Sequence, residues 1–313
     1  MANYLVTGGA GFIGSHLVAA LVDRGHRVRV LDNFSTGRRS NLAAVESRIE
    51  LVEGDLRSGA DCRRACADID VVFHEGAVPS VPKSVEDPVT SHTANIDGTF
   101  NLLEAARAAK CRRVVYAASS SAYGDVPTLP KHEGQAPQPL SPYGVQKLTG
   151  EYYCRAYFEC FGLESIALRY FNVFGPRQDP ASQYAAAIPA FVTAILADRP
   201  PTIYGDGEQT RDFTFIDNVV HANILAAEAK KTSGQSINVA CGERISINRI
   251  VARINEYLGK NVRPNYAPPR AGDVRDSLAD IGLARTIIGY EPKVGFDEGL
   301  RRTIDWYREN WKA

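Results

Sequence analysis

The chain has 313 residues, a formal net charge of zero and a hydrophobic fraction of 44%. This length allows a large buried core and suggests either two domains or one enlarged α/β unit. The neutral charge favours neither nucleic acid nor an anionic membrane as a partner, and no signal-peptide pattern or apolar run of roughly 20 residues is present, so we expect a cytoplasmic protein.

The first predicted element is a strand that begins at Tyr4 and opens into a glycine-rich turn and an amphipathic helix. Three glycines follow one another at spacings of three. Glycine lets a diphosphate approach the backbone closely, and the amides of the helix N-terminus point at its charge, although an ordinary turn is the alternative. We expect this turn to bind a dinucleotide through Gly8, Gly11, Phe12, Ile13 and Gly14.

A second strand is predicted over 27–32, and it ends at Asp32, about 20 residues after the glycine turn. A carboxylate at that position accepts hydrogen bonds from the adenosine ribose and repels a 2′-phosphate, so NAD is favoured over NADP as the cofactor. The alternative is that Asp32 is a helix cap or a turn residue. The polar segment after it is also assigned to cofactor contact, through Asn33, Ser35, Thr36 and Gly37.

Short apolar runs predict further strands over 49–53, 70–74 and 113–118, with helical stretches between them. This alternation is typical of a buried parallel sheet with right-handed crossovers, so we predict a doubly wound α/β fold. The stretch 84–110 is helical in pattern and is broken early by a proline. Within it, Asn95 is expected to reach either the cofactor or the backbone of a loop, and the alternative is a merely solvated side chain.

Six cysteines are scattered among helix-like segments, without the paired spacing of a zinc site. Reduced thiols are therefore expected rather than disulfides. Cys62 and Cys66 can share a helix face, but two ligands without nearby histidines make a poor metal site. We expect no metal.

The strand over 113–118 runs into a cluster of three serines, Ser119 to Ser121, where ligands bind in open α/β sheets. A later helix carries Tyr143 and Lys147 four residues apart on one face. A phenol with a pKa of about 10 is a poor base, but an ammonium one turn away and an oxidised nicotinamide both favour its phenolate. A serine then holds the substrate oxygen or relays its proton. The alternative is a coincidental tyrosine and lysine on one helix.

After residue 172 the alternation of strands and helices loosens. We predict helices over 188–197, 217–231 and 246–258, a strand over 237–240, and an ordered active-site loop over 262–273.

The motifs together resemble those of the extended short-chain dehydrogenase/reductase superfamily. Further phrases resemble UDP-hexose 4-epimerases, most closely the branch that acts on UDP-N-acetylglucosamine; they lie at 80–84, 117–125, 169–177, 204–213 and 270–275. The resemblance runs from Tyr4 to about Trp306. It implies an NAD-binding Rossmann domain over 1–171, with returning segments near 213–240, and a smaller, interleaved α/β lobe mainly over 172–313 that binds the UDP-sugar.

The resemblance also implies roles for individual residues. The catalytic serine lies four residues before the tyrosine of a Tyr-Gly pair, which makes it Ser119, acting with Tyr143 and Lys147. Further cofactor contacts are Asp55 and Leu56 beside adenine, Ala77 and Lys83 along the channel, and Tyr170 or Phe171 beside the nicotinamide. Substrate contacts are Lys83, Ser119, Ser120, Ser121, Tyr143, Asn172, Tyr204, Gln209, Arg211, Arg270, Asp273 and Ser277.

The implied reaction begins when the Tyr143 phenolate takes the proton of the sugar 4′-hydroxyl while hydride passes from C4′ to NAD⁺. The 4-keto sugar then rotates and receives the hydride on its other face. Relatives carry a size-determining residue at the position of Ser277, and a small side chain there leaves room for a 2′-acetamido group. The alternative is that Ser277 is an exposed loop serine. The resemblance further implies a homodimer that pairs the helices around 84–110 and 142–162 of two subunits.

Three other functions remain open at this stage. A 4,6-dehydratase needs an Asp-Glu pair beside the catalytic serine, where this chain has Ser120 and Ser121, so that reading is disfavoured. A UDP-glucuronate 4-epimerase or decarboxylase needs extra partners for the sugar carboxylate, which the sequence does not exclude. A catalytically silent NAD-binding regulator is disfavoured, because it would have no chemical need for Ser119, Tyr143 and Lys147.

Overall fold

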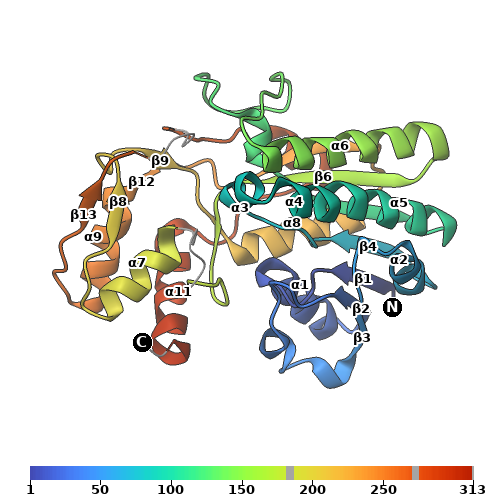
Figure 1. The fold of residues 1–313 in the computed structure, drawn as a ribbon, viewed down its shortest axis with the longest axis horizontal. Helices are drawn as coiled ribbons and strands as arrows, with labels where there is room; N and C mark the ends of the chain where they lie inside the picture. The colour runs from blue at the N-terminus through green and yellow to red at the C-terminus, as the bar shows by residue number, and fades with distance from the viewer. Residues whose placement is uncertain (181–186, 270–274, 312–313) are drawn as a thin grey trace.

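The computed structural model describes residues 1–180, 187–269 and 275–311 (Figure 1). Its centre is a seven-stranded sheet in the order β11-β6-β5-β4-β1-β2-β3, and every neighbouring pair is parallel. The predicted doubly wound fold is confirmed. The strands are β1 (Asn3–Thr7), β2 (Arg27–Asp32), β3 (Ile49–Glu53), β4 (Val71–His74), β5 (Arg113–Ser119), β6 (Glu164–Tyr170) and β11 (Gln235–Val239).

Helices cover both faces of this sheet because successive strand residues point to opposite sides. One face packs Val6, Val30 and Val115 with the apolar sides of α1 (Phe12–Asp23) and α8 (Ile216–Glu228). The other face packs Leu5 and neighbouring apolar residues against three other helices. These helices are α2 (Gly59–Cys66), α5 (Gly98–Ala108) and α6 (Pro142–Phe161).

The strand order reverses between β1 and β4, which leaves a crevice at their carboxyl ends. Ligands of open α/β sheets bind at such a switch point. The glycine turn follows β1, and the serine cluster follows β5, the strand beyond β4. The sheet topology alone therefore brings the two main predicted motifs to one edge.

The stretch predicted as a single broken helix is a series of short ones. It consists of α3 (Val81–Glu86), α4 (Pro88–His92), a π-helical turn η3 (Thr93–Asp97) and then α5. The predicted break at Pro88 is present: α3 ends at Glu86 and α4 begins at Pro88, because proline suits the first turn of a helix and the Asp87 carboxylate accepts a hydrogen bond from the Thr90 amide at 3.0 Å.

The second lobe lies beside the main sheet, on the left of Figure 1, around α7, α9, α11 and the short strands β8, β9, β12 and β13. The expected loop over 262–273 contains a strand, β13, which pairs in parallel with β8. The remaining elements are β7 (Val173–Phe174), α7 (Ala187–Leu196), β8 (Thr202–Tyr204), β9 (Thr210–Arg211), β10 (Thr214–Phe215), β12 (Ile245–Ser246), α9 (Ile247–Leu258), β13 (Asn265–Ala267), α10 (Gly282–Ile288) and α11 (Phe296–Asn310).

Three 3₁₀ turns complete the list of elements: η1 (Arg39–Leu42), η2 (Glu46–Arg48) and η4 (Ser120–Tyr123). All six cysteines are free thiols, as expected. Within the described ranges, no group of three or more histidine, cysteine and acidic side chains is placed to hold a metal ion. In the same part of the chain, no helix is both long enough and apolar enough to cross a membrane.

Candidate active site

The glycine turn forms a cradle that side chains would fill. Gly8 has a φ of +63°, and its carbonyl accepts a hydrogen bond from the Gly11 amide at 3.0 Å. A Cβ atom on Gly14 would lie 2.2 Å from the Gly8 carbonyl oxygen, and one on Gly8 would lie 2.7 Å from the Cα of Gly76. Phe12 and Ile13 begin α1 and are partly exposed beside the turn. This bare backbone at a helix N-terminus fits a diphosphate.

Asp32 connects the glycine turn to the loop that follows β2. Its buried carboxylate accepts hydrogen bonds from the Ala10 amide at 2.9 Å and the Phe34 amide at 2.8 Å. Burial raises the pKa of Asp32, and these two amides lower it. The turn role that the sequence left open is therefore present. A carboxylate has about four acceptor sites, so contact with a ribose remains compatible with it.

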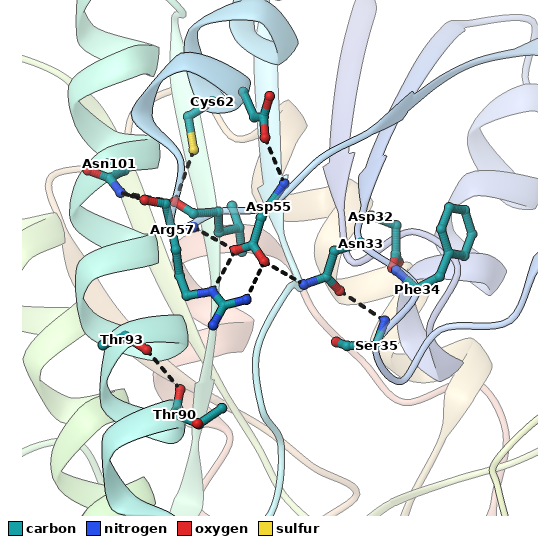
Figure 2. Close-up of polar contacts among 12 residues, drawn as sticks. Asp32, Asn33, Phe34, Ser35, Asp55, Arg57, Cys62, Thr90, Thr93 and Asn101 are labelled. Atoms are coloured by element: carbon teal, nitrogen blue, oxygen red, sulfur yellow. Dashed lines mark hydrogen bonds and ion pairs between the residues drawn. The ribbon is translucent and has the colours of Figure 1, made fainter.

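The loop after Asp32 meets the end of β3 through Asn33 and Asp55, and Figure 2 shows this group. Asn33 donates a hydrogen bond to Asp55 at 2.9 Å. Arg57 clamps the same carboxylate with two bonds of 3.0 and 2.7 Å, which hold the pKa of Asp55 well below its usual range. The polar loop residues Asn33, Ser35 and Thr36 are exposed. The clamping role of Arg57 was missed by sequence reasoning, although its spacing of two from Asp55 was a usable signal.

Gly76 and Gly37 both lie in closely packed surroundings. Leu56 packs so closely against Gly76 that a Cβ atom there would lie 2.8 Å from its Cδ1. Gly37 is equally confined, because its Cβ atom would lie 2.9 Å from the Asp32 carboxylate. Ala77, which follows Gly76 and precedes α3 in the chain, is partly exposed. Cofactor contact by these residues remains a prediction.

Asn95 holds a loop rather than projecting into the crevice. Its side chain is 2% exposed, accepts a hydrogen bond from the Val78 amide at 2.8 Å and donates to Gln146 at 2.8 Å. The loop-backbone alternative is therefore the one observed. Lys83 is exposed on α3, and the hydroxyl of the next residue, Ser84, accepts a hydrogen bond from the Tyr143 amide at 3.0 Å.

The structure brings Ser119, Tyr143 and Lys147 together. Ser119 lies close enough to the Tyr143 phenol to lower its pKa, against the larger opposing effect of burial, and the Ser119 hydroxyl accepts a hydrogen bond from the Ser121 hydroxyl at 2.8 Å. Lys147 is 4% exposed and donates from Nζ to the Ala117 carbonyl at 2.7 Å. The serine cluster is partly exposed at the end of β5. Ser119, Tyr143 and Lys147 can together act as general acid and base, which suits proton transfer to and from a hydroxyl.

The electrostatics of Tyr143 are set mainly by its burial. Burial raises its pKa to about 12, the neighbouring Ser119 lowers it, and the charge of Glu75 raises it. Burial lowers the pKa of Lys147 to about 8, while Glu75 and Glu151 raise it. The lysine is thus itself desolvated and bound to a carbonyl, so it does not produce a phenolate alone. An oxidised nicotinamide bound in the crevice would add a positive charge that favours the phenolate.

Two neighbouring residues at the end of β6 have different surroundings. Phe171 is fully buried, its ring centroid lies 6.2 Å from that of Tyr123, and its amide bonds to the Val239 carbonyl. Tyr170 instead donates from its hydroxyl to Glu75 at 2.7 Å. Contact of either residue with a nicotinamide remains a prediction. The participation of Glu75 was missed, because nothing in the sequence signals that β4 and β6 are linked.

The other predicted substrate residues that the structure describes come from the second lobe. Asn172 donates to the Ser277 hydroxyl at 3.3 Å, and Ser277 is only 9% exposed, so it is not an exposed loop serine. Gln209 donates to the Tyr204 carbonyl at 2.6 Å, and Arg211 donates to the Arg275 carbonyl at 2.9 Å. Arg270 and Asp273 lie outside the described residues.

Comparisons with known proteins identify the family of this chain. Residues 4–240 match the model of the NAD dependent epimerase/dehydratase family. The chain belongs to this family. It is 40% identical over 309 residues to the UDP-glucose 4-epimerase of Mycolicibacterium smegmatis, covering 97% of this chain and 98% of the relative. It is thus an enzyme of an NAD-dependent family, and the glycine cradle and Asp32 fit that cofactor.

Solved structures resemble the whole chain. A UDP-N-acetylglucosamine 4-epimerase from Methanobrevibacter ruminantium M1, in complex with UDP-N-acetylmuramic acid, superposes with a TM-score of 0.94 at 42% identity, covering 98% of both chains. A UDP-glucuronic acid 4-epimerase from Bacillus cereus, in complex with UDP-glucuronic acid and NAD, gives 0.91 at 36% identity, covering 99% of this chain and 100% of the other. These relatives share a reaction but differ in the sugar.

Replacing Tyr143 by phenylalanine removes the phenol oxygen and keeps the ring. We expect Tyr143→Phe to fold and retain nucleotide but to lose about 10²- to 10⁴-fold in kcat, because the proton acceptor is gone. The matched control is Tyr257→Phe, which removes an exposed phenol on α9. Turnover of UDP-sugars by the two variants checks this. Near-wild-type kcat in Tyr143→Phe would end the assignment.

Proposed function

We propose that this chain is an NAD-dependent UDP-hexose 4-epimerase whose main substrates are UDP-N-acetylglucosamine and UDP-N-acetylgalactosamine, with UDP-glucose and UDP-galactose as further substrates. The observation that carries the proposal is the convergence of Ser119, Tyr143 and Lys147 at the crevice that the glycine turn also faces. The six free thiols fit a reducing, cytoplasmic location.

The chemistry assigned to the chain is proton transfer at the sugar 4′-oxygen. Tyr143 accepts the proton, and Ser119 holds the same oxygen while its own position is fixed by Ser121. Lys147 keeps a positive charge one helical turn from the phenol. When bound, NAD supplies the hydride acceptor and donor for C4′. Tyr143 then returns its proton to the keto oxygen after the sugar has presented its other face.

The same site argues against dehydration. A dehydratase needs an acid and a base beside the catalytic serine, whereas Ser120 and Ser121 occupy those positions here. Ser121 uses its hydroxyl to donate to Ser119, which orients the serine rather than acting on a second carbon. The acid–base equipment of the described site therefore serves one sugar oxygen.

Arginine side chains and a small residue define the proposed UDP-sugar pocket. Arg211 lies beside the 275–277 segment, and with Arg270 it is proposed to neutralise the diphosphate through bidentate contacts. Asn172 and Ser277 contact one another in the same lobe. Because serine is small, the pocket has room for a 2′-acetamido group, and a plain hexose leaves that room empty at a modest cost in binding.

The experiment that tests the proposed function is incubation of the purified protein with UDP-N-acetylglucosamine, UDP-glucose and UDP-glucuronate separately, without added NAD, and separation of the products by chromatography. We expect the 4-epimer of the N-acetylated sugar to form fastest. Preferred conversion of UDP-glucuronate would replace the substrate assignment, and absence of any epimer would contradict the function and favour a regulatory role.

Ser277→Tyr places a large ring where the acetamido group is proposed to swing. We expect more than a tenfold loss of kcat/KM on UDP-N-acetylglucosamine, with retained activity on UDP-glucose. Ser277→Ala is the matched control, because it also removes the hydroxyl that bonds Asn172 but stays small, and it should keep the wild-type preference. Equal losses on both sugars in Ser277→Tyr would contradict the role in specificity.

We also propose a homodimer formed by the outer faces of α3 to α6. Phe100 on α5 is 43% exposed, and Tyr152 and Phe161 on α6 are 61% and 55% exposed. Val85 and Val89 extend this apolar surface along α3 and α4. A pair of such helix faces from each subunit suits a four-helix bundle.

Phe100→Glu tests this interface by placing a charge on it. We expect light scattering at micromolar concentration to give twice the chain mass for the wild type and a shift toward monomer for the variant. Tyr266→Glu, at an exposed aromatic on β13 in the other lobe, is the control and should remain dimeric. A wild-type protein that is monomeric throughout the concentration range would refute the dimer.

A further inference from the structure

Glu75 is an acidic residue at the carboxyl end of β4 that the proposed proton transfer does not use. It is the first residue beyond β4, the strand between β1 and β5. The next residue, Gly76, donates from its amide to Thr7 at 3.1 Å and packs against Gly8. Glu75 therefore lies between the glycine turn and the serine cluster, where a dinucleotide would cross the sheet.

The Glu75 carboxylate is held as a hydrogen-bond acceptor. Tyr170 donates to its Oε1 atom at 2.7 Å, and Asn223 of α8 donates to the Tyr170 hydroxyl at 2.7 Å. Because Asn223 supplies a proton to the phenol oxygen, the phenol proton is directed at Glu75. Tyr170 lies opposite Ser119 in the sheet register, so this chain of donors reaches across the end of β5. The arrangement suits a carboxylate anion.

An ionised Glu75 does not help to form the Tyr143 phenolate. Tyr143 and Lys147 of α6 and Tyr170 of β6 are the titratable groups that interact with it. Its charge raises the pKa of Tyr143 and so opposes formation of the phenolate. Lys147 donates to the Ala117 carbonyl instead of forming an ion pair with Glu75. Activation of Tyr143 as a base therefore does not explain a negative charge at Glu75, whereas binding of a positively charged ligand does.

We propose that Glu75 is the electrostatic partner of the oxidised nicotinamide ring and sets the balance between the oxidised and reduced cofactor in this site. The inference rests on the proposed function only in placing the nicotinamide beside Ser119 and Tyr143. The oxidised ring carries a positive charge and the reduced ring does not, so a nearby carboxylate stabilises the oxidised form. It thereby favours the return of hydride to a keto sugar and leaves the enzyme ready for another cycle.

Glu75→Gln removes the charge and keeps the size and the acceptor oxygen. The measurement is the midpoint potential of the bound cofactor in the holoprotein, followed through the absorbance of the reduced nicotinamide, with no sugar present. The pH is set above the Glu75 pKa of about 7, which burial has raised, so that the wild-type carboxylate is ionised. We expect the ratio of oxidised to reduced cofactor to fall on the order of ten- to a hundredfold. Because a tenfold change corresponds to about 30 mV for a two-electron couple, the potential should become more positive by about 30–60 mV.

Two further variants separate charge from contact. Glu75→Asp keeps the charge and shortens the reach to Tyr170, so its potential should stay near that of the wild type. Glu86→Gln removes an exposed carboxylate from α3 with the same change in net charge, and it should not shift the potential.

If Glu75→Gln does not fold, Tyr170→Phe serves in its place, because loss of the phenol donor raises the Glu75 pKa and shifts the potential in the same direction. An unchanged potential in these variants would overturn the proposal, as would a Glu75→Asp potential equal to that of Glu75→Gln. The measurement uses no sugar, so failure of the proposed epimerase activity would leave its result readable.

Discussion

The hydrogen bond from the Lys147 ammonium to the Ala117 carbonyl, 2.7 Å long, connects the helix that carries the proton acceptor to the sheet that carries the serine. β4 pairs with β5 only as far as Tyr116, so the end of β5 beyond it is open on that side. Lys147 supplies a charged donor there and its ammonium also lies 5.1 Å from the centre of the Tyr116 ring. The position of Tyr143 relative to Ser119 depends on this attachment.

A buried ion pair attaches the same helix farther along. Glu151 lies one turn beyond Lys147 and receives two hydrogen bonds from Arg169 of β6, at 2.9 and 2.7 Å, with both side chains almost fully buried. The Arg169 guanidinium also lies over the Tyr123 ring at 4.7 Å. Removing one partner of such a pair costs about 3–5 kcal/mol, because the other charge is left unpaired. Lys147 and Glu151 together therefore fix α6 against the sheet over two successive turns.

The features that could be predicted from the sequence are those encoded by residues close together in the chain. The glycine spacing, the acidic end of β2 and the Tyr143–Lys147 pair follow from chain geometry, and the strand order then brings them together. The misses come from contacts between distant segments. The Glu75–Tyr170 bond joins β4 to β6, and β13 is hidden in a proline-rich stretch because its pairing with β8 comes from a strand far away in sequence. The roles of Arg270 and Asp273 rest on the resemblance alone.

We propose that one site removes a hydrogen from C4′ of the sugar and returns it to the opposite face. The most direct test of this claim uses UDP-N-acetylglucosamine labelled with deuterium at C4′, incubated with purified protein in ordinary water without added NAD. The account predicts that the 4-epimer forms and retains the deuterium at C4′, because only the hydroxyl proton exchanges through Tyr143. Replacement of the label by solvent hydrogen would contradict the account, since the hydrogen would then leave the carbon as a proton.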